Sequence, residues 1–127
     1  MPPPDAIELY FEGVLAHPPL RTIEEVAKCL GWVYEGREEG WHILSALLDI
    51  PLLKAPRIFI KEGAPGRFVG RGVVPAGELT FEILIEKSGD RYRWLFRGVQ
   101  RGAINILGKH LFETLARRMA ERVAACL

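Results

Sequence analysis

The chain has 127 residues, with 17 basic and 16 acidic side chains and a formal net charge of +1. That length suits one domain over residues 1–127, in which 1–6 form an extended, proline-rich lead-in. Hydrophobic residues make up 49% and charged residues 26% of the chain, a globular mixture that excludes disorder for most of it. A net charge near zero also excludes a uniformly basic protein.

The sequence carries no visible targeting segment. Residues 1–5 lack the basic and apolar regions of a secretory signal. The longest uncharged apolar stretch, Trp41 to Leu48, is far shorter than the roughly 20 residues that cross a bilayer. As written, we expect a soluble cytoplasmic protein without a membrane span, and an exported one if a signal peptide was removed, so the compartment stays open.

The first 34 residues predict a strand followed by a helix. Apolar and polar residues alternate over 7–16, which indicates a half-buried strand that Pro18 and Pro19 end. Thr22 and Glu25 have the spacing of a capping box, so a helix is expected to begin at Thr22. Residues 32–34 can continue this helix beyond Gly31.

The next segment is harder to assign. Residues 36–40 are predicted to be a hinge or loop because two glycines flank three charged residues. Trp41 to Asp49 is predicted to be a second, mostly buried helix that Pro51 stops. A short core strand is the alternative, because periodicity alone does not separate the two in so short an apolar run.

From Pro56 onward the pattern favours β-structure. Strands are expected over 57–62 and 67–74, and Gly70 and Gly72 suggest a bulge or a close approach of backbones. A hairpin follows, for which we expect a two-residue loop at Ser88-Gly89. This loop sets four cross-strand pairs: Ile85 with Tyr92, Ile83 with Trp94, Phe81 with Phe96, and Glu86 with Arg91.

The last element is predicted to be one long helix over 103–127. Its apolar stripe consists of Ile104, Leu107, Leu111, Leu115, Met119 and Val123. The expected fold class is therefore α+β: an antiparallel sheet in β-α(α)-β4-α order, with the long C-terminal helix packed on one face.

Element order and three short motifs carry a family resemblance. The motifs are Gly66 to Gly72, Leu79 to Glu86, and Gly89 to Trp94. With these the chain resembles a bacterial domain of unknown function with a TBP-like fold. An added strand pair would give the helix-grip fold of the START and Bet v 1 superfamily. The resemblance implies a fold and no catalytic residues, so it carries no activity over to this chain.

Candidate catalytic and metal sites are weak. His42, Ser45 and Asp49 would share one face of a helix over 41–49, but Ser45 lies between the other two, which is not the order of a catalytic triad. No histidine stands at metal-ligand spacing from another ligand. Cys29 and Cys126 are interpreted as small buried groups, although either could be a reactive thiol. We therefore predict no catalytic residues, no metal and no cofactor.

Two sets of residues are candidate binding sites. An apolar ligand between sheet and helix would contact the predicted inner-face residues Phe81, Ile83, Trp94, Phe96, Leu111 and Leu115. An anion would bind the predicted outer-face residues Arg91, Arg93, Arg97 and Arg101. This second site is suggested because residues 57–127 hold 13 basic and 7 acidic side chains, against 4 and 9 in residues 1–56.

The favoured hypothesis is a non-enzymatic binding module. It would hold an apolar or amphipathic small molecule between sheet and helix, or a protein partner on the sheet. One alternative is a nucleic-acid or anion-binding domain that uses the basic face of residues 57–101. Another is a small enzyme with a site near 41–49 in which His42 acts as acid or base. Self-association through residues 103–127 is a further hypothesis.

Overall fold

The computed structural model describes residues 6–47, 56–74, 77–102 and 108–127. These residues form seven strands and two helices. In chain order they are β1 (Ala6–Leu15), α1 (Ile23–Leu30), β2 (Val33–Glu38), β3 (Trp41–Ser45), β4 (Arg57–Glu62), β5 (Arg67–Val74), β6 (Gly77–Ser88), β7 (Arg91–Gly102) and α2 (Lys109–Ala125).

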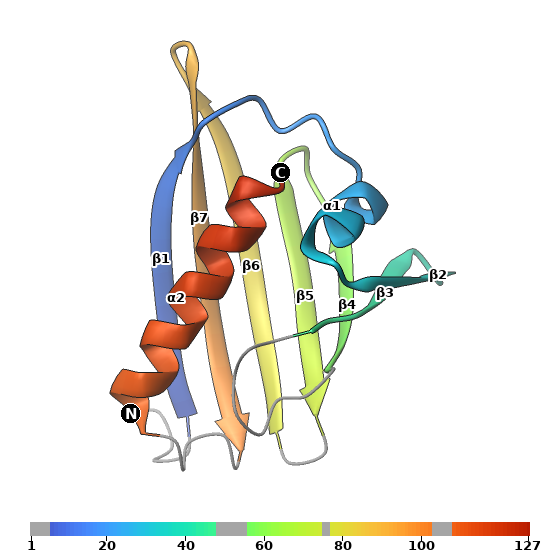
Figure 1. Ribbon diagram of the computed structural model, residues 1–127, viewed down its shortest axis with the longest axis vertical. Helices are drawn as coiled ribbons and strands as arrows, with labels where there is room; N and C mark the ends of the chain where they lie inside the picture. The colour runs from blue at the N-terminus through green and yellow to red at the C-terminus, as the bar shows by residue number, and fades with distance from the viewer. Residues whose placement is uncertain (1–5, 48–55, 75–76, 103–107) are drawn as a thin grey trace.

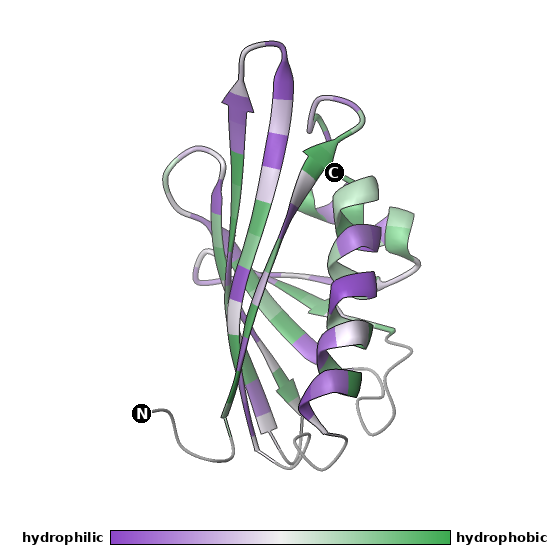
Figure 2. Cartoon of the chain, turned by 90° about the vertical axis from the view of Figure 1, so that its left-hand side faces the viewer, coloured by the Kyte–Doolittle hydropathy of each residue, from purple (hydrophilic) through white to green (hydrophobic). Residues whose placement is uncertain are grey.

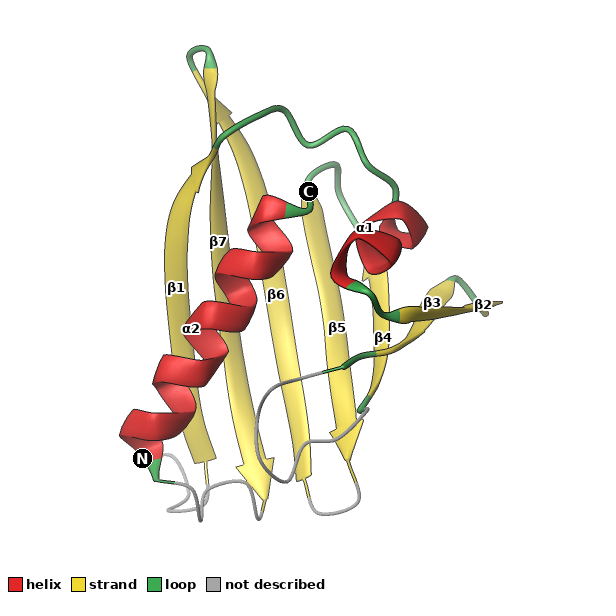
Figure 3. Ribbon diagram, viewed as in Figure 1, coloured by secondary structure: helices red, strands yellow, loops and turns green. Residues whose placement is uncertain are grey.

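All seven strands belong to one antiparallel sheet in the order β1-β7-β6-β5-β4-β3-β2. The sheet curves, so that β2 and β3 run across the direction of β1 and β7 (Figures 1 and 3). Both helices lie on its concave face (Figure 2). The α+β class and the C-terminal helix packed on one face are thus confirmed. Neither described helix combines the length and apolar character that crossing a membrane requires.

The first helix begins and ends where local chemistry dictates. Thr22 and Glu25 form the predicted capping box, with the Glu25 amide donating to the Thr22 hydroxyl at 3.1 Å. In return, the Thr22 amide donates to the Glu25 carboxylate at 2.9 Å, and this second bond lowers the pKa of the Glu25 carboxyl from its ordinary value because it favours the charged form. The helix ends at Gly31, which takes a left-handed conformation and donates to carbonyls of the last turn.

The predicted helix over 41–49 and the continuation of the first helix over 32–34 are wrong as far as the structure describes them, and the loop predicted over 36–40 is reduced to a turn at 39–40. The alternative of a short core strand is confirmed over Trp41–Ser45. Residues 33–38 and 41–45 are the two strands of a hairpin, so six strands rather than four lie between the helices. The reversal is a two-residue turn in which Glu39 and Gly40 both have positive φ, 52° and 83°. This geometry is that of a type I′ turn, which normally recruits asparagine or aspartate before glycine. Residues 48–50 lie outside the described part of the chain.

The hairpin of β6 and β7 has the predicted faces and a different register. Ile85 lies opposite Trp94, Ile83 opposite Phe96, and Glu86 opposite Arg93. The two-residue turn is Gly89-Asp90 rather than Ser88-Gly89, with Gly89 at φ 66° in its first position, as in type II′ turns. The shift amounts to two residues along the partner strand, so every side chain keeps its predicted face.

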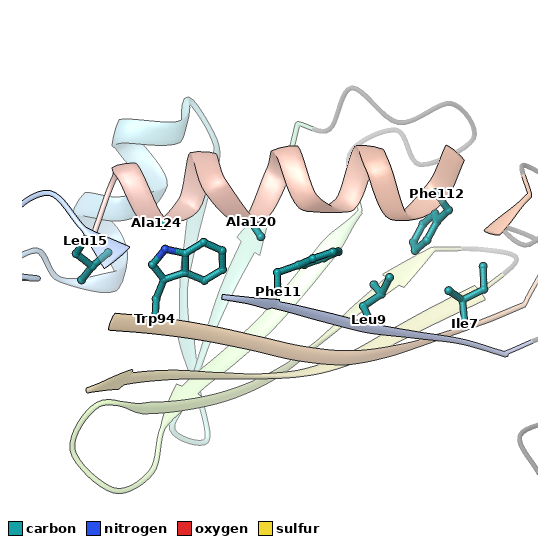
Figure 4. Close-up of a cluster of buried hydrophobic side chains, with 8 residues drawn as sticks. All are labelled: Ile7, Leu9, Phe11, Leu15, Trp94, Phe112, Ala120 and Ala124. Atoms are coloured by element: carbon teal, nitrogen blue, oxygen red, sulfur yellow. The ribbon is translucent and has the colours of Figure 1, made fainter. Parts of the chain in front are cut away.

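Helix α2 packs on β1 and β7 to form the larger core cluster. Figure 4 shows its members: Ile7, Leu9, Phe11, Leu15, Trp94, Phe112, Ala120 and Ala124. The predicted stripe on α2 is displaced by one residue, because Phe112 is 2% exposed whereas Leu111 is 47% exposed. The buried edge of the helix contains alanines, whose weak hydrophobicity hides it in the sequence. Residues 103–107 of the predicted helix lie outside the described part.

A disulfide joins the two helices. Cys29 of α1 and Cys126, directly after α2, are bonded with their Cα atoms 5.8 Å apart, so the prediction of two buried thiols is wrong. Arg21 adds a second link, since its Nη1 donates to the Cys126 carbonyl at 3.0 Å. The sequence separation of 97 residues gives no local signal for this pairing.

Removing the disulfide should lower the free energy of unfolding by about 2–5 kcal/mol, because the bond closes a long loop in the unfolded chain. The variant Cys29→Ser/Cys126→Ala tests this in urea unfolding followed by circular dichroism. Wild type in reductant should match the variant, and reductant should not change the variant itself. Free thiols in the oxidised wild type, detected by mass after alkylation, would contradict the pairing.

Candidate binding cavity

A cavity of about 520 Å³ lies between the concave face of the sheet and the two helices. Most of its lining is apolar and comes from almost every element, including Ile58, Phe81, Ile83, Phe96, Val26 and Met119. Helix α2 packs against β1 and helix α1 against β2, which are the two edge strands. The middle strands of the curved sheet therefore face an unfilled space.

Glycine contributes to the floor of this space. Gly72 on β5 lies between Ile58 on β4 and Leu79 on β6 in the strand register. A Cβ atom added there would meet only the Ile58 Cγ1 atom, at 3.8 Å. Gly70, two residues earlier, differs because an added Cβ would lie 2.6 Å from the ring of Phe81. Of these two glycines, Gly72 therefore leaves open room beside the cavity.

Stacked aromatic rings form another part of the wall. Phe96 on β7 stacks on Phe11 of β1, with ring centroids 5.9 Å apart, and on Phe81 of β6, at 5.7 Å. Phe81 and Phe96 line the cavity and keep part of their surface exposed. The stack holds both rings in place, so the wall is formed before any ligand arrives.

The structure brings four of the six predicted ligand-contacting residues together at the cavity. Phe81, Ile83, Trp94 and Phe96 line it, whereas Leu111 and Leu115 are not among its lining residues. Leu111 is largely exposed, and Leu115 packs against the β1–α2 cluster. The one-residue displacement of the buried stripe on α2 explains the difference, because it turns Phe112 and Ala116 toward the cavity instead.

Five polar residues also line the cavity, and the sequence analysis assigned none of them to the apolar site. They are Gln100, His42, Glu62, Arg21 and Thr22. Gln100 is 2% exposed, whereas Glu62, Arg21 and Thr22 are exposed. The alternation of side chains along β7 could have identified Gln100. Every second residue of this strand faces inward, and Gln100 follows Tyr92, Trp94 and Phe96 in that series.

His42 lies on the wall formed by β3. Its Nδ1 atom is 2.8 Å from the hydroxyl of Tyr34 on β2. Burial lowers the pKa of His42 from its ordinary value of 6.5, and the positive charge of Arg37, directly opposite on β2, lowers it further. His42 is therefore neutral at pH 7 and can offer its other ring nitrogen to the cavity.

The proposed grouping of His42, Ser45 and Asp49 on one helical face is wrong for the described pair. On a strand, residues 42 and 45 point to opposite faces, and Asp49 lies outside the described residues. Within the described ranges 6–47, 56–74, 77–102 and 108–127, no three His, Cys, Asp or Glu side chains are grouped to hold a metal ion.

The four candidate anion-binding arginines lie on the outer face of β7 and are exposed. Three of them face a glutamate directly across on β6: Arg93 with Glu86, Arg97 with Glu82, and Arg101 with Glu78. Arg93 also lies 3.6 Å from Glu12 of β1. Glu82 and Glu78 are ion-paired with Arg67 and Arg71 of β5, at 2.8 and 3.9 Å, so the glutamates of β6 are shared between the arginines of two strands.

Comparison with protein-family models and with curated proteins gives no match for this chain. The class of the protein is thus given by its own geometry: an antiparallel α+β sheet that encloses a mainly apolar cavity beneath two disulfide-linked helices.

Acid should destabilise the fold through His42. Its folded-state pKa lies below the 6.5 of the free side chain, so the unfolded chain binds the proton more readily. Neutral His42 makes its full contribution to the free energy of unfolding above about pH 6.5, and this contribution is lost as the pH falls below that value. The midpoint of urea unfolding should decrease as the pH is lowered from 7.5 to 5. In His42→Gln this dependence of the midpoint on pH should be weaker.

The matched control is His110→Gln, which changes an exposed histidine at the start of α2. This variant should keep the wild-type slope. An unchanged slope in His42→Gln would show that protonation of His42 does not contribute to the acid sensitivity.

Proposed function

We propose that this protein is a non-enzymatic binding module that holds an apolar or amphipathic small molecule between its sheet and its two helices. The observation that carries the proposal is the cavity of about 520 Å³ with its largely apolar lining. Ligand pockets for small molecules typically measure about 300–1,000 Å³ and combine apolar walls with a few polar groups. The cavity has both properties.

Energetics favour an occupant that is mainly apolar. Ile58, Phe81 and Ile83 face the cavity and are only partly buried in the absence of a ligand. Removing apolar surface from water stabilises a complex by about 25 cal/mol for each Å². A ligand that covers these side chains removes apolar surface of both the ligand and the protein from water, and both areas stabilise the complex.

The fold supports the same function as an analogy. We propose the helix-grip arrangement of the START and Bet v 1 superfamily rather than the five-stranded TBP-like one. The order β-α-β6-α contains the additional strand pair that separates the two, here β2 and β3. Because one fold serves many activities, the cavity and not the fold carries the functional argument.

The polar groups of the cavity favour binding over catalysis. His42 is engaged with Tyr34. Thr22 is the hydroxyl residue among the described lining residues, and it is engaged as the N-cap of α1. Nucleophilic catalysis needs a hydroxyl or thiol within hydrogen-bond reach of a base. The Tyr34 hydroxyl meets this condition with His42, but Tyr34 is not among the residues that line the cavity. We therefore assign these groups to positioning a ligand.

A larger side chain at Gly72 should weaken binding in the cavity without loss of stability. A Cβ atom at this position makes only an ordinary contact with Ile58, and the backbone is not in the left-handed region, so a leucine is not strained there. Residues with a side chain also form strands more readily than glycine does. We expect wild type to enhance and blue-shift the fluorescence of the neutral apolar probe N-phenyl-1-naphthylamine. Gly72→Leu should weaken its affinity at least tenfold and keep or raise the melting temperature.

Val73→Leu is the matched control, because it enlarges the neighbouring side chain on the outer face of the same strand, where Val73 is 39% exposed. It should bind the probe as wild type does. A folded Gly72→Leu variant with wild-type affinity would refute the cavity as the binding site, and a wild type that binds no apolar probe would refute the function.

A further inference from the structure

We infer that Gln100 anchors the ligand and selects one with a neutral hydrogen-bonding group, such as a hydroxyl, at one end of an apolar body. This inference rests on the proposed function and narrows its ligand class. It is carried by a buried amide that lines a cavity whose walls are otherwise mostly apolar.

Gln100 is the buried polar side chain of the described residues, at 2% exposure. Its Nε2 atom donates to the Arg101 carbonyl at 2.8 Å. Among the described residues its amide makes no other hydrogen bond, which leaves one N–H and the oxygen lone pairs for another partner. Buried polar groups are rarely left without partners, because desolvating them costs free energy that only hydrogen bonds offset.

The described neighbours of Gln100 do not supply that partner with their side chains. The register places Gln100 between Ile7 on β1 and Leu79 on β6. Phe112 lines the same cavity from α2, and Figure 4 shows it above Ile7 and Leu9. On β6 the backbone approaches closely, because a Cβ atom at Gly77 would lie 3.1 Å from the Gln100 Nε2 atom. The amide is thus held between apolar side chains and a glycine.

The surroundings favour a neutral group over an ion. The charged lining residues are Arg21 and Glu62, and both are exposed. Glu62 is four residues along β4 from Ile58, which shares the cross-strand row of Gln100, so it lies about 13 Å further along the strands. Arg101 faces Glu78 on the opposite side of the sheet. A carboxylate beside Gln100 would therefore be buried without a countercharge, which is costly.

Arg21 does not supply the countercharge either. It precedes α1, and its guanidinium donates to the carbonyl of Cys126 at the end of α2. Phe112, which packs near Ile7 beside Gln100, lies in the first turn of α2 (Figure 4). Gln100 and Arg21 thus sit toward opposite ends of this helix. The apolar body of the ligand would extend from Gln100 over Gly72 toward the end marked by Glu62.

Three rigid probes of one shape test the inference: naphthalene, 2-naphthol and 2-naphthoate, measured with wild-type protein by equilibrium dialysis. We expect 2-naphthol to bind at least tenfold more tightly than either of the others. Gln100→Met keeps the side-chain length and removes the amide, so it should bring the affinity for 2-naphthol down to that for naphthalene. Val99→Thr, on the outer face of the same strand, should keep the wild-type preference.

A second measurement does not depend on whether Gln100→Met folds. In wild type, the side-chain amide resonances of Gln100 should shift on addition of 2-naphthol and change much less with naphthalene. If no probe binds, the proposed function itself fails. If naphthalene and 2-naphthol bind equally and Gln100→Met changes neither affinity, the role of Gln100 as an anchor is refuted, whereas the cavity remains supported as a binding site. Tightest binding of 2-naphthoate would refute the neutral ligand class.

Discussion

The linkage between the two helices is the constraint on which the rest of the structure depends. Helix α2 packs on β1 and helix α1 on β2, so each helix is attached to an opposite edge of a seven-stranded sheet. The Cys29–Cys126 bond and the Arg21 hydrogen bond join them across the concave face. Because the helices are fixed at the edges and to each other, they span the middle strands without filling the space above them.

The apolar core is divided into two clusters, and members of both line the cavity. One apolar cluster lies where α2 meets β1 and β7, and a second lies where α1 meets β2 and β3. The cavity lies between the two clusters, over strands that present Gly72, Ile58 and Phe81. A cavity in the larger cluster would remove contacts that hold the fold together. Here the unfilled volume lies over the middle strands, between the edge strands that the two helices pack against.

The sequence predicted what depends on local chemistry and failed where distant contacts decide. The Thr22–Glu25 cap and the faces of β6 and β7 follow from spacing alone, and both are confirmed. The strand alternative for residues 41–45 is confirmed, but the hairpin that pairs β3 with β2 was not predicted, because its turn places Glu39 at positive φ, which few side chains adopt. Residues 97 positions apart form the disulfide, and Gln100 is buried at the cavity only because distant elements cover it. Neither fact is encoded locally.

The two faces of strand β7 differ in their chemistry. Its outward side chains include Arg93, Arg97 and Arg101, and the glutamates of β6 stand directly opposite each of them. Glu82 and Glu78 are ion-paired with Arg67 and Arg71 of β5, so the glutamates of β6 offset positive charge on both neighbouring strands. The inward side chains of the same strand end in Gln100, whose amide keeps bonding capacity that no described neighbour takes up. Recognition needs groups that the fold leaves unsatisfied, and on β7 that group faces the cavity.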